Sequence, residues 1–309
     1  MDQAQGLRTL IPPAPGMNED RASFGSYDNT VRPRRPRVIS VSSGKGGVGK
    51  TNIVANFAWA FTRMGRRVLI FDADLSLANI DVLLGLAPKY TVEHLFKREK
   101  SIFEILVQGP GGMRIIPASS GVLDLIDLDE TQKIFLLNEL DLLAETIDVL
   151  LIDTGTGISS NVLYFNTAAA ESIIIVTPEP TSITDAYALI KVLSQKYRKK
   201  DFLILINAVR SPAEGKDVFK KLTRVTDRFQ ADLSLDYLGF LPFDEKLPQA
   251  VKQQKPVLKL FPDCAVSRSL WEMACSLADR PAPGAEGTVG FFWRQLFQFH
   301  SSTSNGGID

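Results

Sequence analysis

Short apolar runs alternate along the chain with longer stretches in which apolar residues recur at helical spacing. Such runs, bounded by Gly, Pro or Asp, are typical of strands buried on both faces of a parallel sheet. They predict strands over residues 38–41, 68–71, 113–116, 149–152, 172–176, 202–206 and 237–241. The amphipathic stretches predict helices over residues 52–64, 131–146, 182–197, 215–228 and 265–278. This alternation indicates an α/β fold with a doubly wound, mostly parallel sheet that binds ligands at the carboxyl ends of its strands.

The segment before the first predicted strand has a different composition. Residues 1–36 are rich in Pro, Gly and Asn and end in a run of arginines and prolines. A segment of this kind buries little apolar surface, so we expect a flexible tail in front of a single domain that spans residues 37–280. The arginine and proline run is explained either as a solvated linker or as a contact with an anionic surface.

Residues 281–309 follow this domain as a proline-containing linker and a strongly aromatic segment. Over residues 287–300, helical spacing gathers apolar side chains on one broad face. They are Val289, Phe292, Trp293, Leu296 and Phe299, flanked by Phe291 and Phe297. Because Trp and Phe favour the headgroup boundary of a bilayer, we expect an interfacial membrane helix, bound mainly through apolar burial. The alternative is a terminal helix that packs on its own domain or on a partner.

Composition narrows the class of protein. The 309 residues include 35 basic and 35 acidic side chains, so the whole molecule has no net charge that would favour nucleic acid or an anionic membrane. Two cysteines, Cys264 and Cys275, and only two histidines argue against a metal cage or a disulfide framework. No apolar run is long enough to span a bilayer and no signal peptide is evident, so we expect a protein of the reducing cytoplasm.

One loop carries the strongest functional signal. Residues 44–51 are Gly-Lys-Gly-Gly-Val-Gly-Lys-Thr and lie between the first predicted strand and helix, which is the context that a phosphate-binding loop requires. Glycines let backbone N–H groups and the positive end of the helix face an anion. Lys50 is expected to reach the β- and γ-phosphates and the Thr51 hydroxyl to bind Mg²⁺, whereas the alternative is an ordinary glycine-rich turn. The predicted nucleotide-binding residues of this region are Gly44, Lys45, Gly46, Gly47, Val48, Gly49, Lys50, Thr51 and Asn52.

Carboxylates at the ends of two other predicted strands would complete a hydrolase site. Asp72 and Asp74 follow the second strand and Asp153 follows the fourth. We assign Asp74 to positioning the attacking water, and Asp72 and Asp153, together with Thr51, to holding the metal ion. Helix capping by the aspartate pair and a simple turn at Asp153 are the alternatives.

Two further strand ends suggest how the base is recognised. The amide of Asn207 can both donate and accept, which suits the N6 and N7 edge of adenine. Guanine recognition of the Asn-Lys-x-Asp type needs a carboxylate three residues later, where this chain has Arg210, so ATP is favoured over GTP. Pro242 and Asp244, after the last predicted strand, are expected to close over the base.

A second lysine, Lys45, lies inside the phosphate loop. The pattern Lys-Gly-Gly-x-Gly-Lys-Thr resembles the deviant Walker A motif of the class that contains MinD, ParA and the nitrogenase iron protein. That resemblance implies a MinD-like P-loop NTPase that forms a homodimer with ATP, in which Lys45 acts on the nucleotide of the second protomer. Lys45 thus joins Lys50 and Asp74 as a candidate catalytic residue.

Over nearly its whole length the chain resembles the FlhG (FleN) family of flagellar-number regulators. The resemblance rests on the phosphate loop, residues 72–81 and residues 178–191. It departs at residues 153–157, which are Asp-Thr-Gly-Thr-Gly where Asp-x-Ala-Ala-Gly is commoner, and this difference bears on how mobile that loop is.

The resemblance implies partners for both tails. In residues 2–10, Gln3 would stimulate the GTPase FlhF, with Leu7 and Arg8 docking on it. The C-terminal helix would bind the inner membrane, and flagellar switch (C-ring) components or a flagellar transcription regulator would be further partners. The implied membrane residues are Phe291, Phe292, Trp293, Leu296, Phe297 and Phe299.

The resemblance also implies a cycle in which ATP closes a dimer at the membrane, at the cell pole, and hydrolysis returns monomers to the cytoplasm. Alternatives are a ParA- or MinD-type ATPase that positions DNA or the division machinery, a metabolic enzyme of the same fold, and a GTPase adaptor. The neutral charge and aromatic tail argue against DNA binding, so no specific nucleic acid is expected. An iron-protein reductase would need cysteines near the nucleotide loops, and Arg210 disfavours GTP.

Overall fold

The computed structural model describes residues 36–74, 79–117, 130–229 and 233–281. The predicted FlhF-stimulating motif (residues 2–10, with Gln3, Leu7 and Arg8) and the predicted membrane helix (residues 287–300) lie outside these ranges, so both stay predictions.

The described residues form a single eight-stranded sheet with the order β3-β4-β2-β5-β1-β6-β7-β8. The strands are β1 (Arg37–Ser43), β2 (Val68–Ala73), β3 (Val107–Gln108), β4 (Arg114–Ile116), β5 (Val149–Thr156), β6 (Glu171–Val176), β7 (Asp201–Val209) and β8 (Ser234–Pro242). All neighbours pair in parallel except β3 and β4. The predicted doubly wound, mostly parallel sheet is therefore confirmed.

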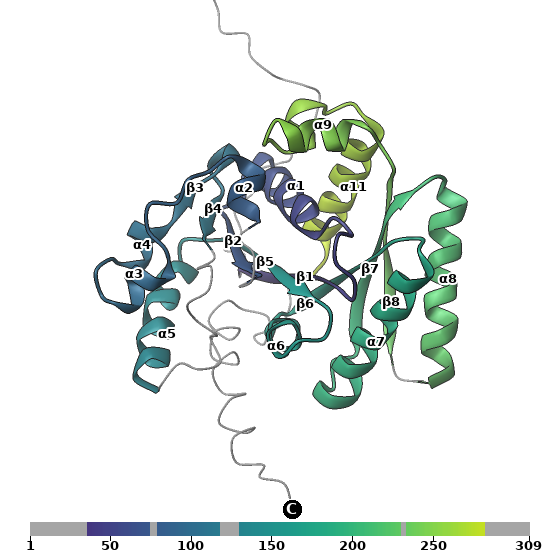
Figure 1. The fold of residues 1–309 in the computed structure, drawn as a ribbon, viewed down its shortest axis with the longest axis horizontal. Helices are drawn as coiled ribbons and strands as arrows, with labels where there is room; N and C mark the ends of the chain where they lie inside the picture. The colour runs from purple at the N-terminus through teal and green to yellow at the C-terminus, as the bar shows by residue number, and fades with distance from the viewer. Residues whose placement is uncertain (1–35, 75–78, 118–129, 230–232, 282–309) are drawn as a thin grey trace, which may run out of the picture. The chain divides into compact units, whose positions relative to one another are not determined.

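Helices cover both faces of the sheet (Figure 1). One face is covered by α1 (Lys50–Arg63), α2 (Ile80–Leu84), α9 (Lys246–Lys252), α10 (Val257–Leu260) and α11 (Ala265–Asp279). The other is covered by α3 (Val92–Phe96), α4 (Ile102–Ile105), α5 (Glu130–Ala144), α6 (Ser160–Ala168), α7 (Pro180–Tyr197) and α8 (Pro212–Phe229). None of the helices in the described ranges is long and apolar enough to cross a membrane.

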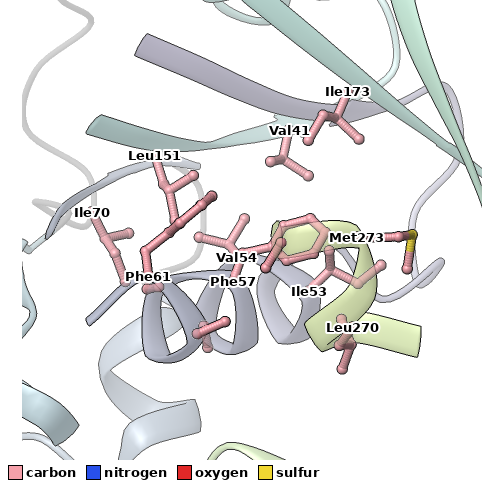
Figure 2. Close-up of a cluster of buried hydrophobic side chains, with 14 of the residues drawn as sticks. Val41, Ile53, Val54, Phe57, Phe61, Ile70, Leu151, Ile173, Leu270 and Met273 are labelled. Atoms are coloured by element: carbon pink, nitrogen blue, oxygen red, sulfur yellow. The ribbon is translucent and has the colours of Figure 1, made fainter. Parts of the chain in front are cut away.

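The apolar face of α1 fixes the position of the phosphate loop. Ile53 and Phe57 point from α1 toward Val41 and Ile173 of the central strands, and Met273 of α11 lies beside them (Figure 2). All five side chains are at most 4% exposed. Burial of such side chains contributes about 1.5–3 kcal/mol each. The start of α1 is thereby held at the carboxyl end of β1.

The five helices predicted between residues 52 and 278 are all present, with ends shifted by up to three residues. Helix α7 begins at Pro180, because proline is tolerated in the first helical turn. Helix α6 had no amphipathic signal. Its residues 162–165 are all buried because it packs between two apolar clusters, so no polar face interrupts the run.

A cluster of ion pairs lies at the amino ends of the strands, away from the phosphate loop at their carboxyl ends. The Arg37 guanidinium donates to both carboxylate oxygens of Glu171, at 2.6 and 2.7 Å, and both side chains are at least 86% buried. It also donates to the Leu277 carbonyl and, at 3.2 Å, to the Arg280 carbonyl at the end of α11. Arg280 in turn pairs with Asp236 at 2.9 Å. We call Arg37, Glu171, Asp236 and Arg280 the basal clamp, because it ties β1, β6, β8 and α11 together.

Candidate functional site

The phosphate loop connects β1 to α1, as the pattern predicts. Gly47 and Gly49 have φ of +75° and +94°, in the left-handed region that glycine adopts at little cost. Gly49 is the N-cap of α1 and has no side chain to cap it. The first N–H groups of α1 therefore face the loop without a side-chain partner at the cap, as in an anion-binding helix terminus.

Gly44 is packed against the backbone of α7. A Cβ at this position would lie 2.2 Å from the Asp185 carbonyl carbon and 2.7 Å from the Ala186 nitrogen. Such distances are far below van der Waals contact, so only glycine fits here. The position of the phosphate loop thus depends on α7, which the motif alone does not reveal.

Lys50 and Lys45 lie in different environments within the same loop. Lys50 is 7% exposed, and burial lowers the pKa of its ammonium group, while the charges of Asp153 and Asp74 act in the opposite direction. The Lys45 side chain is 37% exposed and its ammonium group forms an ion pair with Glu179 at the start of α7. Lys50 is therefore placed to act inside its own loop, whereas Lys45 lies at the rim.

Asp72 and Asp153 are register neighbours on β2 and β5 and are fully or almost fully buried. Burial raises the pKa of Asp153 to about 7, and the charge of Asp72 adds to this effect. Burial also raises the pKa of Asp72 to about 6, against the influence of its backbone hydrogen bonds. Two such carboxylates next to a buried lysine are the kind of group that gathers at functional sites.

The two carboxylates differ in their partners. Asp72 accepts from the backbone N–H groups of Asp74, Asn79 and Ile80 at 3.2–3.3 Å, so it also holds the start of α2, as the capping alternative predicted. Within the described part of the chain, neither oxygen of Asp153 has a hydrogen-bond partner at ordinary distance and angle. Nearby, the Asp74 carboxylate lies 3.8 Å from the position of a Cβ on Gly155. The site thus brings Lys50, Asp74 and Asp153 together.

A buried carboxylate with no well-formed hydrogen bond fits a cation site, and the Thr51 hydroxyl is close enough to lower the pKa of Asp153. Among the described residues no group of three or more acidic, histidine or cysteine side chains could hold a metal by itself. That agrees with Mg²⁺ chemistry, since this ion is held by one or two carboxylates, water and the phosphates of a nucleotide. Asp153 and Thr51 would hold it, with Asp72 behind them.

The predicted base-binding residues lie at the carboxyl ends of β7 and β8. Asn207 and Asp244 already form hydrogen bonds within the protein. The Asn207 amide donates to the Val48 carbonyl at 2.7 Å and accepts from the Ala208 N–H at 2.8 Å. These bonds use one donor and one acceptor position of an amide that has four positions in all. Asn207 therefore supports the phosphate loop, and its role toward adenine stays a prediction.

Asp244 has a structural role that the sequence did not reveal. Its carboxylate accepts from the N–H groups of Lys246 at 2.9 Å and Val266 at 3.3 Å, at the starts of α9 and α11. The neighbouring Pro242 pairs in register with Val209. The end of β8 and the residues after it are thus held beside Val209, two residues after Asn207, and Phe243 is 65% exposed.

Comparison with known proteins agrees with this geometry. Residues 39–257 match the family of the CobQ/CobB/MinD/ParA nucleotide binding domain. The septum site-determining protein MinD of Pyrococcus horikoshii, solved in complex with Mg-ADP, has the same fold, with a TM-score of 0.62 over 79% of this chain and 96% of that one at 23% identity. The fold and the phosphate loop therefore define a P-loop nucleotide-binding domain of the MinD/ParA class.

Curated relatives narrow the class further. The chain is 43% identical to the antiactivator FleN of Pseudomonas aeruginosa, over 87% of this chain and 96% of the relative. It is 34% identical to the flagellum site-determining protein YlxH of Helicobacter pylori, over 96% of this chain and 98% of that protein. The chain belongs to the FleN/FlhG family.

Proposed function

We propose that the chain is an Mg²⁺-dependent ATPase that acts as a dimerisation switch and controls flagellar number and placement. The observation that carries the proposal is the contrast between Lys50, buried beside Asp153 and Asp74, and Lys45, exposed at the rim of the same loop. A second lysine at the rim of the loop, with an ion pair that is open to solvent, is placed to reach a nucleotide outside its own protomer. Membership of the FleN/FlhG family supports the flagellar role.

The residues of one protomer divide the chemistry among them. The loop N–H groups and Lys50 bind the β- and γ-phosphates, and the buried surroundings strengthen these interactions. Asp74 orients the water that attacks the γ-phosphorus, in line with the leaving oxygen. Bound Mg²⁺ would supply charge neutralisation between the two phosphates, held by Thr51 and Asp153. Asn207 recognises adenine through the positions of its amide that are not used within the loop.

The second protomer completes the site. Lys45 leaves Glu179 and crosses to the nucleotide of its partner, where it compensates the negative charge that develops during hydrolysis. Because the ion pair with Glu179 is largely solvent-exposed, breaking it costs at most about 1 kcal/mol. A nucleotide clamped between two protomers can supply more than that.

The two tails connect this switch to the cell. The helix at residues 287–300 binds the inner face of the membrane, at the pole, when two copies act together in the ATP dimer. Residues 2–10 stimulate FlhF through Gln3, and C-ring components or a transcription regulator bind further surfaces. If deletion of residues 2–10 leaves both FlhF capture and its GTP hydrolysis unchanged, this part of the proposal is wrong.

The central proposal is tested by light scattering after gel filtration, with a nonhydrolysable ATP analogue and Mg²⁺. We expect dimers from the wild type and monomers from Lys45→Ala, and at least a tenfold lower ATP turnover in Lys45→Ala. The wild type should hydrolyse GTP more slowly than ATP. Lys97→Ala is the matched control, because Lys97 forms an exposed ion pair on the surface helix α3. Dimers and normal turnover from Lys45→Ala would contradict the proposal.

A further inference from the structure

A chain of buried polar groups lies beneath the phosphate loop, between β1, β6, α6 and the end of β5. It consists of Ser172, Ser40, Asn166, Ser42 and Thr154, each at most 1% exposed. We call this chain the buried relay. Buried polar groups are costly unless all are hydrogen-bonded, so a chain of five inside an apolar core needs an explanation.

Every member of the relay has a hydrogen-bond partner. Ser172 and Ser40 hydroxyls are 2.9 Å apart, and Ser40 donates to the Asn166 carbonyl oxygen at 3.0 Å. The Asn166 amide nitrogen donates to Ser42 at 2.6 Å, and the Ser42 and Thr154 hydroxyls are 2.8 Å apart. Because Ser42 accepts from Asn166, it donates its one proton to Thr154. At the end, Thr154 donates its proton to a backbone carbonyl, that of Val41 at 3.1 Å or Gly155 at 3.0 Å. At the other end, the backbone carbonyls of Glu171 and Asn166 are further acceptors for Ser40 and Ser172, each at 3.3 Å.

The relay ends at the loop that carries Asp153. The register between β1 and β5 shifts between Val41, which pairs with Asp153, and Ser43, which pairs with Thr156. Thr154 lies within this irregularity, and its hydroxyl bonds to β1 where the regular ladder is interrupted. On the far side of the irregularity, the Gly157 N–H donates to the Ser43 carbonyl at 3.0 Å. The segment from Asp153 to Gly157, which is the end of β5 and the first residue after it, is therefore attached to β1 on both sides of the irregularity, while Asp153 and Thr154 pair with β2 on the other side.

We propose that Thr154 is a positioning residue, whose hydroxyl, oriented by Ser42 and Asn166, bridges the irregularity between β1 and β5 and so holds the Asp153–Gly157 segment in place beside the phosphate loop before nucleotide binds. This inference rests on the proposed ATPase function. Here the loop is prearranged, so less ordering is needed when the γ-phosphate arrives.

The test compares Thr154→Val, Thr154→Ser and Ser172→Ala in the full-length protein. Thr154→Val keeps the shape and removes the hydroxyl, whereas Thr154→Ser keeps the hydroxyl. Ser172→Ala removes a buried hydroxyl at the far end of the relay, which Ser40 and Asn166 separate from the loop. It controls for a loss of stability alone.

We expect about a tenfold lower kcat in Thr154→Val with an unchanged Kd for ADP, and kcat within about twofold of wild type in the other two variants. In the protein free of nucleotide and metal, amide hydrogen exchange over residues 153–160 should be faster only in Thr154→Val. Unchanged kcat and unchanged exchange in Thr154→Val would overturn the inference, as would an equal loss of kcat in Ser172→Ala. If the wild type does not hydrolyse ATP, the proposed function fails, and the exchange comparison still decides whether Thr154 positions the loop.

Discussion

At the scale of single residues, the site depends on contacts between groups far apart in the sequence. Only glycine fits at position 44, because the backbone of Asp185 lies against its α-carbon. Lys45 forms an ion pair with Glu179. Asp185 belongs to α7, and Glu179 is the N-cap of that helix. The phosphate loop is thus a joint product of its own glycines and of a helix more than a hundred residues later.

Gly44→Ala should displace the loop from α7. The added Cβ would lie 2.2 Å from the Asp185 carbonyl carbon. The nearest atoms are all backbone atoms of Asp185 and Ala186, so no flexible side chain can move away. We expect a loss of about 1–3 kcal/mol in the free energy of urea unfolding, measured without nucleotide, and at least a tenfold weaker Kd for ATP.

Gly46→Ala is the matched control for stability, because the nearest atom to its Cβ would be a Thr156 methyl group at 4.0 Å. Its unfolding free energy should stay close to that of the wild type. Equal destabilisation by the two substitutions would show that the contact with α7 is not what Gly44 provides.

The residue types of the site could be predicted from the sequence, but their partners could not. Lys50, Asp74 and Asp153 come together as expected, because carboxyl ends of parallel strands share one edge. Nothing in the sequence indicated that Asp244 caps two helices or that Asn207 supports Val48, since each depends on how strands and helices pack. Thr154 occupies the variable position of the Asp-x-Ala-Ala-Gly pattern, so nothing in the sequence drew attention to its hydroxyl.

At the scale of elements, strands and amphipathic helices were predictable because each has its own periodicity. The exceptions have physical reasons. Helix α6 is buried on several sides, and α2, α3 and α4 have only four or five residues each, too few to show a period. The basal clamp was equally hidden, because Arg37 and Glu171 meet only when β1 pairs with β6.

The clamp provides an element-scale prediction. Glu171→Gln removes the charge that balances Arg37 while both groups remain buried, which is far more costly than the loss of a surface pair. We expect about 2–4 kcal/mol lower unfolding free energy in urea, with the start of β1 and the end of α11 exchanging amide hydrogens faster.

Glu93→Gln is the comparison, since Glu93 pairs with Lys97 at 2.6 Å on an exposed helix. Its effect should stay below about 0.5 kcal/mol. Similar effects of the two substitutions would mean that the clamp contributes no more than a surface ion pair.

At the scale of the whole molecule, the proposed cycle couples nucleotide to membrane. Asp74→Ala should slow hydrolysis and prolong the ATP dimer, in which two weak anchors bind together. We therefore expect more protein to sediment with anionic liposomes in the presence of ATP and Mg²⁺ than for the wild type, and no difference with ADP.

Trp293→Glu, combined with Asp74→Ala, controls for the route of binding, because a charge in the aromatic segment opposes its burial in lipid. The double variant should stay in the supernatant. If Asp74→Ala does not increase sedimentation, nucleotide and membrane are not coupled as proposed.

The basal clamp also joins the first and the last element of the described domain. The Arg37 guanidinium donates to the Arg280 carbonyl, so the start of β1 and the end of α11 lie next to each other. This contact lies at the amino end of β1, a full strand length of about 20 Å from the phosphate loop at its carboxyl end. A change in the basal clamp therefore acts on the start of β1 and the end of α11 together.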